Sequence, residues 1–412
     1  MAKKRNIIVG QSGGPTSVIN SSLAGVYKNA VERGFDKVYG MLHGIQGLLD
    51  EQYIDLSTQI HSELDIELLK RTPSAFLGSC RYKLPHYLDD DSSYVFLFKQ
   101  FEQYHVEAFF YIGGNDSMDT VLKLSEYAKR IGSSVRIIGI PKTIDNDLCE
   151  TDHTPGFGSA AKYIASSLLE IAHDTFIYAV NSVTIVEIMG RDAGWLTAAS
   201  ALARNGYNTA PHLIYLPEVP FDKEDFLLDV KRMLFERNNV IVAVSEGIRD
   251  ASGNYISASE SSVDTFGHSQ LSGAGKTLEF LVKEKLGVKV RSVEVNVLQR
   301  CAAHLASKTD LDEAFTLGQK AVALSEEGVT ASMVTIRRIS DSPYEIAYEH
   351  AEIRHIANEA KSIPREWIND AGNDVTQPLI DYLSPLILGE VPVKYENGIP
   401  VYMDVSHLAK HQ

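Results

Sequence analysis

The chain has 412 residues, 44% of them hydrophobic, and a formal net charge of −15. This length allows two or three domains with well-filled cores. The negative charge and the lack of a long basic run argue against a nucleic-acid or anionic-membrane surface. Three widely spaced cysteines, Cys80, Cys149 and Cys301, suit a reducing compartment and form no metal-binding pattern. Without a signal peptide or a membrane-spanning apolar run, we expect a soluble, cytoplasmic protein.

Short β-branched runs alternate with helical patterns along the chain, which is typical of parallel α/β layers. Glycines and charged residues gather where the strands end, and open α/β sheets bind ligands at those ends. The long polar stretch 140–158 suggests a crossing between two lobes, and the chain beyond 330 looks like an appended surface or interface region. In chain order we expect strands over 6–10, 36–41, 106–114, 135–140, 181–190, 211–218, 239–247 and 290–296, with helices near 15–33, 117–131, 158–174, 192–205, 222–237 and 275–286.

The first glycine-rich turn is GQSGGPTSVIN (10–20), which follows the first strand and opens a helix with Pro15 in its first turn. Gly13 and Gly14 allow close approach of the backbone, and a helix start attracts anions. The spacing matches neither common nucleotide-binding glycine motif. The turn therefore indicates a phosphate site, with a plain strand–helix connection as the alternative.

A second such turn, GGNDS (113–117), follows a long apolar strand. An amide and a carboxylate beside a phosphate cradle suggest Mg²⁺ held by oxygen ligands. Capping of the next helix by Asp116 or Ser117 would explain the same residues equally well.

The stretch PKTIDNDLC (141–149) places Lys142, Thr143, Asp145 and Asp147 directly after another strand. Two carboxylates near a lysine fit phosphoryl transfer, because one acid can accept a hydroxyl proton while the cation offsets phosphate charge. The alternative is an Asx-type turn with a solvated lysine.

Three further strand ends carry charged residues that suit a sugar phosphate. EIMGRDAGWL (187–196) offers an arginine fork, although a structural ion pair is almost as common. VSEGI (244–248) offers a carboxylate for sugar hydroxyls, and RSVEVNVLQR (291–300) has an arginine at each end. By contrast, SGAGKTLEF (272–280) only imitates a P-loop, because Gln270 stands where its first glycine belongs. We interpret it as a helix start.

Taken in order, G-G-P, G-G-N-D-S, P-K-T-I-D-N-D, M-G-R, S-E-G and the closing Q-R resemble the phosphofructokinase family over about residues 6–320. The chain is most similar to the pyrophosphate-dependent branch. The resemblance implies two Rossmann-like three-layer lobes, with the active site in the cleft between them. It implies a pyrophosphate and Mg²⁺ lobe at 1–155 and about 298–330, a sugar-phosphate lobe at 156–297 and a C-terminal extension at 331–412.

The resemblance also assigns residues to the sugar. Asp145 matches the family's catalytic base, which takes the proton from the 1-hydroxyl of fructose 6-phosphate. Arg291 matches an arginine that reaches in from a neighbouring subunit, which implies a homodimer or homotetramer. Val297 replaces a sugar-binding histidine, so only backbone or packing contact is expected there. The implied sugar-phosphate contacts are Thr143, Ile144, Asp145, Met189, Gly190, Arg191, Glu246, Arg291, Val297 and Arg300.

On the donor side, the resemblance implies contacts from Gly13, Arg81, Gly114 and Asp116. ATP-dependent members carry glycine where this chain has Asp116. A carboxylate there would repel the α-phosphate by about 4 kcal/mol at 4 Å and an effective dielectric constant of 20, which is a discrimination of about a thousandfold. Lys142 replaces a family glycine, and it would act catalytically by supplying positive charge to a shorter donor.

The metal position departs from the family pattern. The usual G-G-D-D-S has become G-G-N-D-S, so the common Mg²⁺ ligand is the neutral Asn115. We expect the ion to be held by Asn115, Asp116 or Asp147.

We therefore expect reversible transfer of a phosphoryl group from pyrophosphate to fructose 6-phosphate, with Mg²⁺ and with neither nucleic acid nor membrane as partner. The alternatives are an ATP-dependent 6-phosphofructokinase and a non-catalytic sugar-phosphate-binding subunit. The sequence leaves open a second acceptor such as sedoheptulose 7-phosphate, and it leaves open allosteric control.

Overall fold

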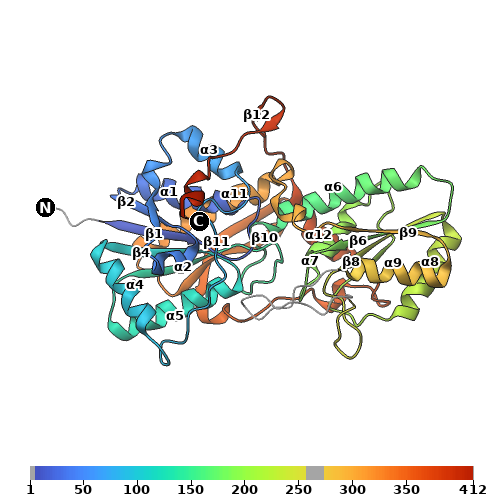
Figure 1. The fold of residues 1–412 in the computed structure, drawn as a ribbon, viewed down its shortest axis with the longest axis horizontal. Helices are drawn as coiled ribbons and strands as arrows, with labels where there is room; N and C mark the ends of the chain where they lie inside the picture. The colour runs from blue at the N-terminus through green and yellow to red at the C-terminus, as the bar shows by residue number, and fades with distance from the viewer. Residues whose placement is uncertain (1–4, 257–272, 412) are drawn as a thin grey trace.

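A computed structural model describes residues 5–256 and 273–411, and it shows two lobes, each built around its own sheet (Figure 1). The first lobe has a seven-stranded sheet in the order β11-β10-β5-β4-β1-β2-β3. Its pairings are parallel except for β2 with β3 and β10 with β11. The strands are β1 (Asn6–Gln11), β2 (Lys37–Met41), β3 (Tyr53–Asp55), β4 (Val106–Gly113), β5 (Arg136–Pro141), β10 (Ser332–Asp341) and β11 (Tyr344–Glu352).

Helices cover both faces of this sheet, because its central strands are apolar on both sides. Ile7 and Val9 of β1 enter one hydrophobic core, and Ile8 enters the other. The first core is closed by α1 (Ile19–Glu32), α3 (Glu63–Arg71) and α11 (Lys308–Glu326). The second is closed by α2 (Gly44–Leu49), α4 (Ser92–Gln103) and α5 (Asn115–Ile131). The lobe is therefore a three-layer sandwich.

The second lobe repeats this design on a four-stranded, fully parallel sheet in the order β7-β8-β6-β9. Its strands are β6 (Ser182–Ile188), β7 (Leu213–Tyr215), β8 (Asn239–Ser245) and β9 (Lys289–Glu294). One face packs on α6 (Phe157–Phe176), α7 (Trp195–Ala199) and α12 (Gln377–Leu383), and the other on α8 (Lys223–Glu236) and α9 (Ala274–Leu286). A short helix, α10 (Leu298–Cys301), follows β9. The two-lobed α/β fold expected from the sequence is confirmed.

The start of α9 explains the apparent P-loop. The backbone N–H groups of Gly273 and Gly275 donate to the Glu187 carboxylate at 3.0 and 2.7 Å. A carboxylate of the chain itself thus occupies the positive end of this helix. The interpretation as a helix start is confirmed.

The structure corrects the expected beginning of the first helix. α1 begins at Ile19 rather than near residue 15, so Pro15 lies in a loop outside it. The loop is held by another segment of the same chain, since Ser74 N donates to Thr16 O at 3.2 Å. The glycine turn at Gly13 and Gly14 therefore ends several residues before the helix.

The C-terminal region also differs from expectation. β10 pairs in parallel with β5, and its Met333, Val334 and Ile336 are buried in the first lobe. The expected boundary of an appended extension at 331 is therefore wrong, because the chain from Ser332 completes the main sheet. The last segment contains the hairpin β12 (Tyr395–Glu396) and β13 (Ile399–Pro400) and returns to the first lobe (Figure 1). In the described part of the chain, no helix has the length and apolar character that a membrane crossing requires.

Candidate active site

Three neighbouring strand ends of the first lobe bring the donor-side motifs together. Ser12, after β1, donates its N–H to Ile112 O at 2.9 Å, and Lys142 N donates to Gly113 O at 3.0 Å. The glycine turns after β1 and β4 and the charged loop after β5 therefore lie side by side at the carboxyl edge of one sheet. This is the edge at which α/β sheets bind ligands.

Lys142 lies inside this glycine cradle. Only 2% of the residue is exposed, and its Nζ donates to Gly14 O at 2.6 Å. A Cβ atom added to Gly13 would lie 3.4 Å from the same Nζ. Burial lowers the pKa of Lys142 to about 8, and the positive charges of Arg300 and Arg81 also lower it. The negative charges of Asp145 and Asp147 raise it, but by less. The alternative of a solvated lysine is therefore wrong.

Arg300 adds a second cation to the same place. Its Nη1 lies 3.4 Å from the position of a Cβ on Gly14. Burial lowers the pKa of Arg300, and so does the nearby guanidinium of Arg81. Arg300 is also within electrostatic range of Asp145 and Glu246, so it stands between the donor turn and the second lobe. Three cations within electrostatic range of one another make a strong anion site.

The two carboxylates of the loop after β5 lie close together. Asp145 N donates to Thr143 Oγ1 at 3.1 Å, and the same hydroxyl lies 3.4 Å from Asp145 Oδ2. Burial raises the pKa of Asp145, although Lys142 and Arg191 oppose the change. Burial and then the negative charge of Asp145 raise the pKa of Asp147 to about 7. In such a pair of carboxylates, one can accept a proton while the other binds a cation.

The second lobe contributes a loop with a required glycine. Gly190 has φ +144°, and a Cβ there would lie 2.6 Å from Ala193 O. Its N–H donates to Glu246 Oε1 at 3.4 Å, and its carbonyl accepts from Ser245 Oγ. Burial raises the pKa of Glu246 to about 7, and Asp145 of the other lobe contributes to the rise. Residues 190 and 246 therefore face the loop after β5.

Arg191 belongs to the same loop. Its Nε pairs with Asp192 Oδ2 at 3.2 Å, so part of the ion pairing considered from the sequence is present. Arg191 also acts electrostatically on Asp145 and Glu246. The M-G-R and S-E-G motifs are thus brought to the T-I-D-N-D loop.

The other residues predicted to contact the sugar phosphate differ in burial and in their contacts. Ile144 is buried in the second lobe's core, so the loop after β5 crosses between the lobes. Met189 N donates to Gln299 Oε1 at 3.2 Å, and Gln299 is 2% exposed. Gln299 therefore fixes Met189, a role that the sequence analysis missed although Q-R was part of its pattern. Val297 leaves 47% of its surface exposed.

Arg291 stands apart from the other predicted site residues. It lies on β9, the edge strand of the second sheet, where its side chain donates to Asp174 Oδ2 at 2.7 Å and to Thr184 Oγ1 at 3.2 Å. These partners belong to α6 and to the first half of β6, whereas Glu246 follows the carboxyl end of β8.

Asn115 is bound by the C-terminal region. Its Nδ2 donates to Glu359 O at 2.5 Å and its Oδ1 accepts from Asn358 N at 2.6 Å. An aspartate could accept but not donate here, so the amide matches this backbone where a carboxylate would not. The N-cap of α5 is Gly114 and no side chain caps it, so the alternative of capping by Asp116 or Ser117 is wrong.

Two acids near these contacts could hold a metal ion. Asp116 lies in the first turn of α5, and Asp147 carries a raised pKa beside Asp145, as expected of acids that gain from a nearby cation. No three His, Cys, Asp or Glu side chains of residues 5–256 and 273–411 form a complete metal cluster. Mg²⁺ commonly takes one or two carboxylates together with phosphate oxygens and water. Asp116 and Asp147 fit that requirement, whereas Asn115 has its amide committed to residues 358–359.

Lys361 was not anticipated from the sequence. Its N–H donates to Asp147 O at 2.7 Å, and its Nζ donates to Thr151 O and Asp152 O at 3.0 and 2.7 Å. Residues 358–361 thus connect the turn after β4 with the loop after β5. No local sequence pattern relates residues more than two hundred positions apart.

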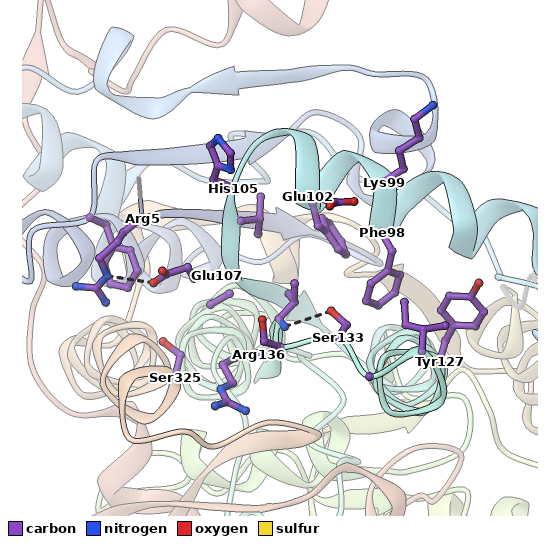
Figure 2. Close-up of a pocket in the computed structure, with 18 of the residues that line it drawn as sticks. Arg5, Phe98, Lys99, Glu102, His105, Glu107, Tyr127, Ser133, Arg136 and Ser325 are labelled. Atoms are coloured by element: carbon purple, nitrogen blue, oxygen red, sulfur yellow. Dashed lines mark hydrogen bonds and ion pairs between the residues drawn. The ribbon is translucent and has the colours of Figure 1, made fainter. Parts of the chain in front are cut away.

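A separate cavity lies at the opposite edge of the first sheet, where β1, β4 and β5 begin (Figure 2). Its volume is about 940 Å³, and its wall includes Arg5, Glu107 and Arg136. Arg5 Nε pairs with Glu107 Oε2 at 3.0 Å, so part of its charge is neutralised internally. None of the predicted site residues lines this cavity, and the candidate site is therefore at the other edge.

The chain is similar to known proteins in sequence and in fold. The family described as phosphofructokinase matches residues 6–325. A pyrophosphate–fructose 6-phosphate 1-phosphotransferase from Halomonas elongata is 42% identical, over 99% of this chain and 97% of its own. Two crystal structures of pyrophosphate-dependent phosphofructokinases are each 38% identical to this chain. The structure from Nitrosospira multiformis has a TM-score of 0.88, and the match covers 98% of this chain and 96% of that one. The structure from Marinobacter aquaeolei has a TM-score of 0.86, and the match covers 97% of this chain and 96% of that one. The chain belongs to the phosphofructokinase family.

Proposed function

We propose that this protein transfers a phosphoryl group from pyrophosphate to the 1-hydroxyl of fructose 6-phosphate, and that it also runs the reverse reaction. The names of its relatives support this proposal. The observation that carries it is the buried Lys142, whose ammonium group lies against the glycine turn after β1 and within electrostatic range of Asp145. A fixed cation in the cradle suits a donor that consists of phosphates alone.

The chemistry follows from the placement of charges. Asp145 accepts the proton of the sugar 1-hydroxyl as that oxygen attacks the terminal phosphorus. The bond from phosphorus to the bridging oxygen breaks, and inorganic phosphate leaves with that oxygen and its electron pair. Lys142 and Arg81 offset the charge on the transferring and leaving groups. Arg191, Glu246 and Arg300 hold the sugar phosphate against Asp145.

We propose that Asp116 and Asp147 hold Mg²⁺ together with the phosphate oxygens of the donor. When bound there, the ion would neutralise donor charge and fix the orientation of the phosphates. Asn115 is left out of this ligand set because its amide binds Asn358 and Glu359.

Arg291 suggests more than one subunit. Since it lies on an edge strand and its side chain pairs with Asp174 of α6, we propose that it serves the sugar-phosphate site of a neighbouring copy in a homodimer or homotetramer. The assignment of the first lobe to the donor and of the second to the sugar is likewise a proposal. So is the cytoplasmic location expected from the sequence.

The deciding experiment is a donor assay. Purified protein with fructose 6-phosphate and Mg²⁺ should form fructose 1,6-bisphosphate with pyrophosphate, and kcat/KM with ATP should be lower by about a thousandfold. A preference for ATP would overturn the donor assignment and leave a sugar kinase. Activity with neither donor would favour a non-catalytic sugar-phosphate-binding subunit.

A further inference from the structure

Asn146 separates the two acids of the site and has an unusual backbone conformation. Its φ is +54°, in the left-handed region, which asparagine enters at a smaller cost than most other residues with a side chain. It is fully buried, so both ends of its amide need partners. Oδ1 accepts from Thr154 N at 3.1 Å, and Nδ2 donates to Tyr382 Oη at 3.0 Å. These bonds compensate for the backbone cost.

Tyr382 reaches this position from α12, in the C-terminal part of the chain. Its hydroxyl accepts from Asn146 and donates to Asp152 O at 2.7 Å. The single donor of the hydroxyl is therefore used within the loop that also contains Asn146. The hydroxyl closes a bridge between residues 146 and 152.

The ring of Tyr382 is held by both lobes. It packs against Trp195 of α7 and against Trp367, with ring centroids 5.5 and 5.3 Å apart. On another side the Arg338 guanidinium of β10 lies 4.5 Å from the ring centroid. Since the ring is fixed from several directions, the position of its hydroxyl is fixed as well.

We propose that Tyr382 is a positioning residue for phosphoryl transfer: its hydroxyl holds Asn146 in the left-handed conformation and so sets the directions of the Asp145 and Asp147 carboxylates on either side. The inference rests on the proposed function of that loop. If the bond to Tyr382 is lost, Asn146 can relax out of the left-handed conformation and turn both acids. Displacements of about 1 Å at reacting groups cost about a hundredfold in rate.

The test is Tyr382→Phe, which keeps the ring packing and removes only the hydroxyl. We expect kcat to fall by about 10- to 100-fold, with KM for each substrate changed by less than about threefold. This pattern indicates loss of an effect on the transition state rather than on substrate binding. The matched control is Tyr27→Phe, because Tyr27 also donates its hydroxyl to a backbone carbonyl, that of Ile60, at 3.2 Å. Tyr27→Phe should lose some thermal stability but retain its kcat.

A double variant separates positioning from general destabilisation. Asn146→Gly permits the same backbone conformation without the side-chain bonds, and it should also lower kcat. If Tyr382 acts through Asn146, Tyr382→Phe combined with Asn146→Gly should be no slower than Asn146→Gly alone. Additive losses, or an unchanged kcat in Tyr382→Phe, would overturn the inference while the proposed function stands. Absence of wild-type activity with either donor would instead overturn the proposed function.

Discussion

Lys142 is a single residue whose charge should control donor binding. Burial, Arg300 and Arg81 lower its pKa to about 8, so it is charged below that pH and neutral above it. Because kcat/KM reports groups of the free enzyme, its value for pyrophosphate should fall about tenfold per pH unit above pH 8. Lys142→Met should lower kcat/KM for pyrophosphate below pH 8 by about 10²- to 10³-fold, and its kcat/KM should no longer fall above pH 8. If kcat/KM of Lys142→Met still falls above pH 8, the fall belongs to the substrate, and its attribution to Lys142 is contradicted.

Asp116 is the residue expected to refuse a nucleoside triphosphate. Asp116→Gly removes both volume and charge, and kcat/KM with ATP should rise, by up to about a thousandfold. Asp116→Asn keeps the volume and removes the charge, so the two variants separate repulsion from steric exclusion. Initial rates with ATP and with pyrophosphate provide the measurement. If the ratio of kcat/KM with ATP to kcat/KM with pyrophosphate rises in neither variant, Asp116 does not determine the donor.

Among the elements, α5 is tied to the C-terminal segment by Asn115. Asn115→Ala loses the bonds to Asn358 N and Glu359 O and should release residues 358–361 from the turn after β4. Trypsin should then cut after Lys361 faster than in the wild type, as mass spectrometry of the fragments would show. Asn208→Ala is the control, since Asn208 Nδ2 binds Ala203 O and Ala210 O within the second lobe. Equal cleavage after Lys361 in both variants would contradict the role of Asn115.

The elements that sequence could predict are those with a local signal. β4 and β8 are continuous apolar runs because both of their faces are buried, and runs of this kind were recognised. β10 and β11 were missed because much of β11 and the second half of β10 are exposed, which breaks that pattern. α11 was missed although Ser307 caps it by accepting from Asp310 N, a signal that the sequence does contain.

The site was predictable to the same extent. Lys142 and Asp145 stand in one short motif at a strand end, so their proximity follows from chain connectivity. Tyr382 and Lys361 reach that loop only through the packing of the two lobes, and no spacing in the sequence relates them to it. The hydrogen bonds between the Asn115 amide and the backbone of residues 358–359 could not be predicted for the same reason.

For the molecule as a whole, the junction of the lobes contains a buried ionic cluster. His153 Nδ1 lies 2.7 Å from Asp152 Oδ2, and its Nε2 lies 2.6 Å from Glu313 Oε2 of α11. Arg338 of β10 pairs with Asp152 at 2.9 Å, and the Tyr344 hydroxyl of β11 donates to Glu313 at 2.8 Å. The cluster therefore joins the loop that contains Asp145 and Asp147 to the helix and strands that complete the first lobe.

This cluster should make stability depend on pH. Burial alone would lower the pKa of His153, but Glu313 and Asp152 outweigh burial and raise it to about 9. The stabilisation is fully present below the unfolded pKa of about 6.5 and is lost as pH rises through 9, which amounts to about 3 kcal/mol. His153→Gln lacks this titration, so its deficit in free energy of unfolding should be about 3 kcal/mol smaller at pH 10 than at pH 6. Urea denaturation at a series of pH values measures the difference in free energy of unfolding between the two proteins. The titrations of Lys142 and Lys361 cancel in this difference because both proteins contain these lysines. A deficit independent of pH would mean that His153 is neutral in the folded protein and that the cluster holds the lobes together by hydrogen bonding alone.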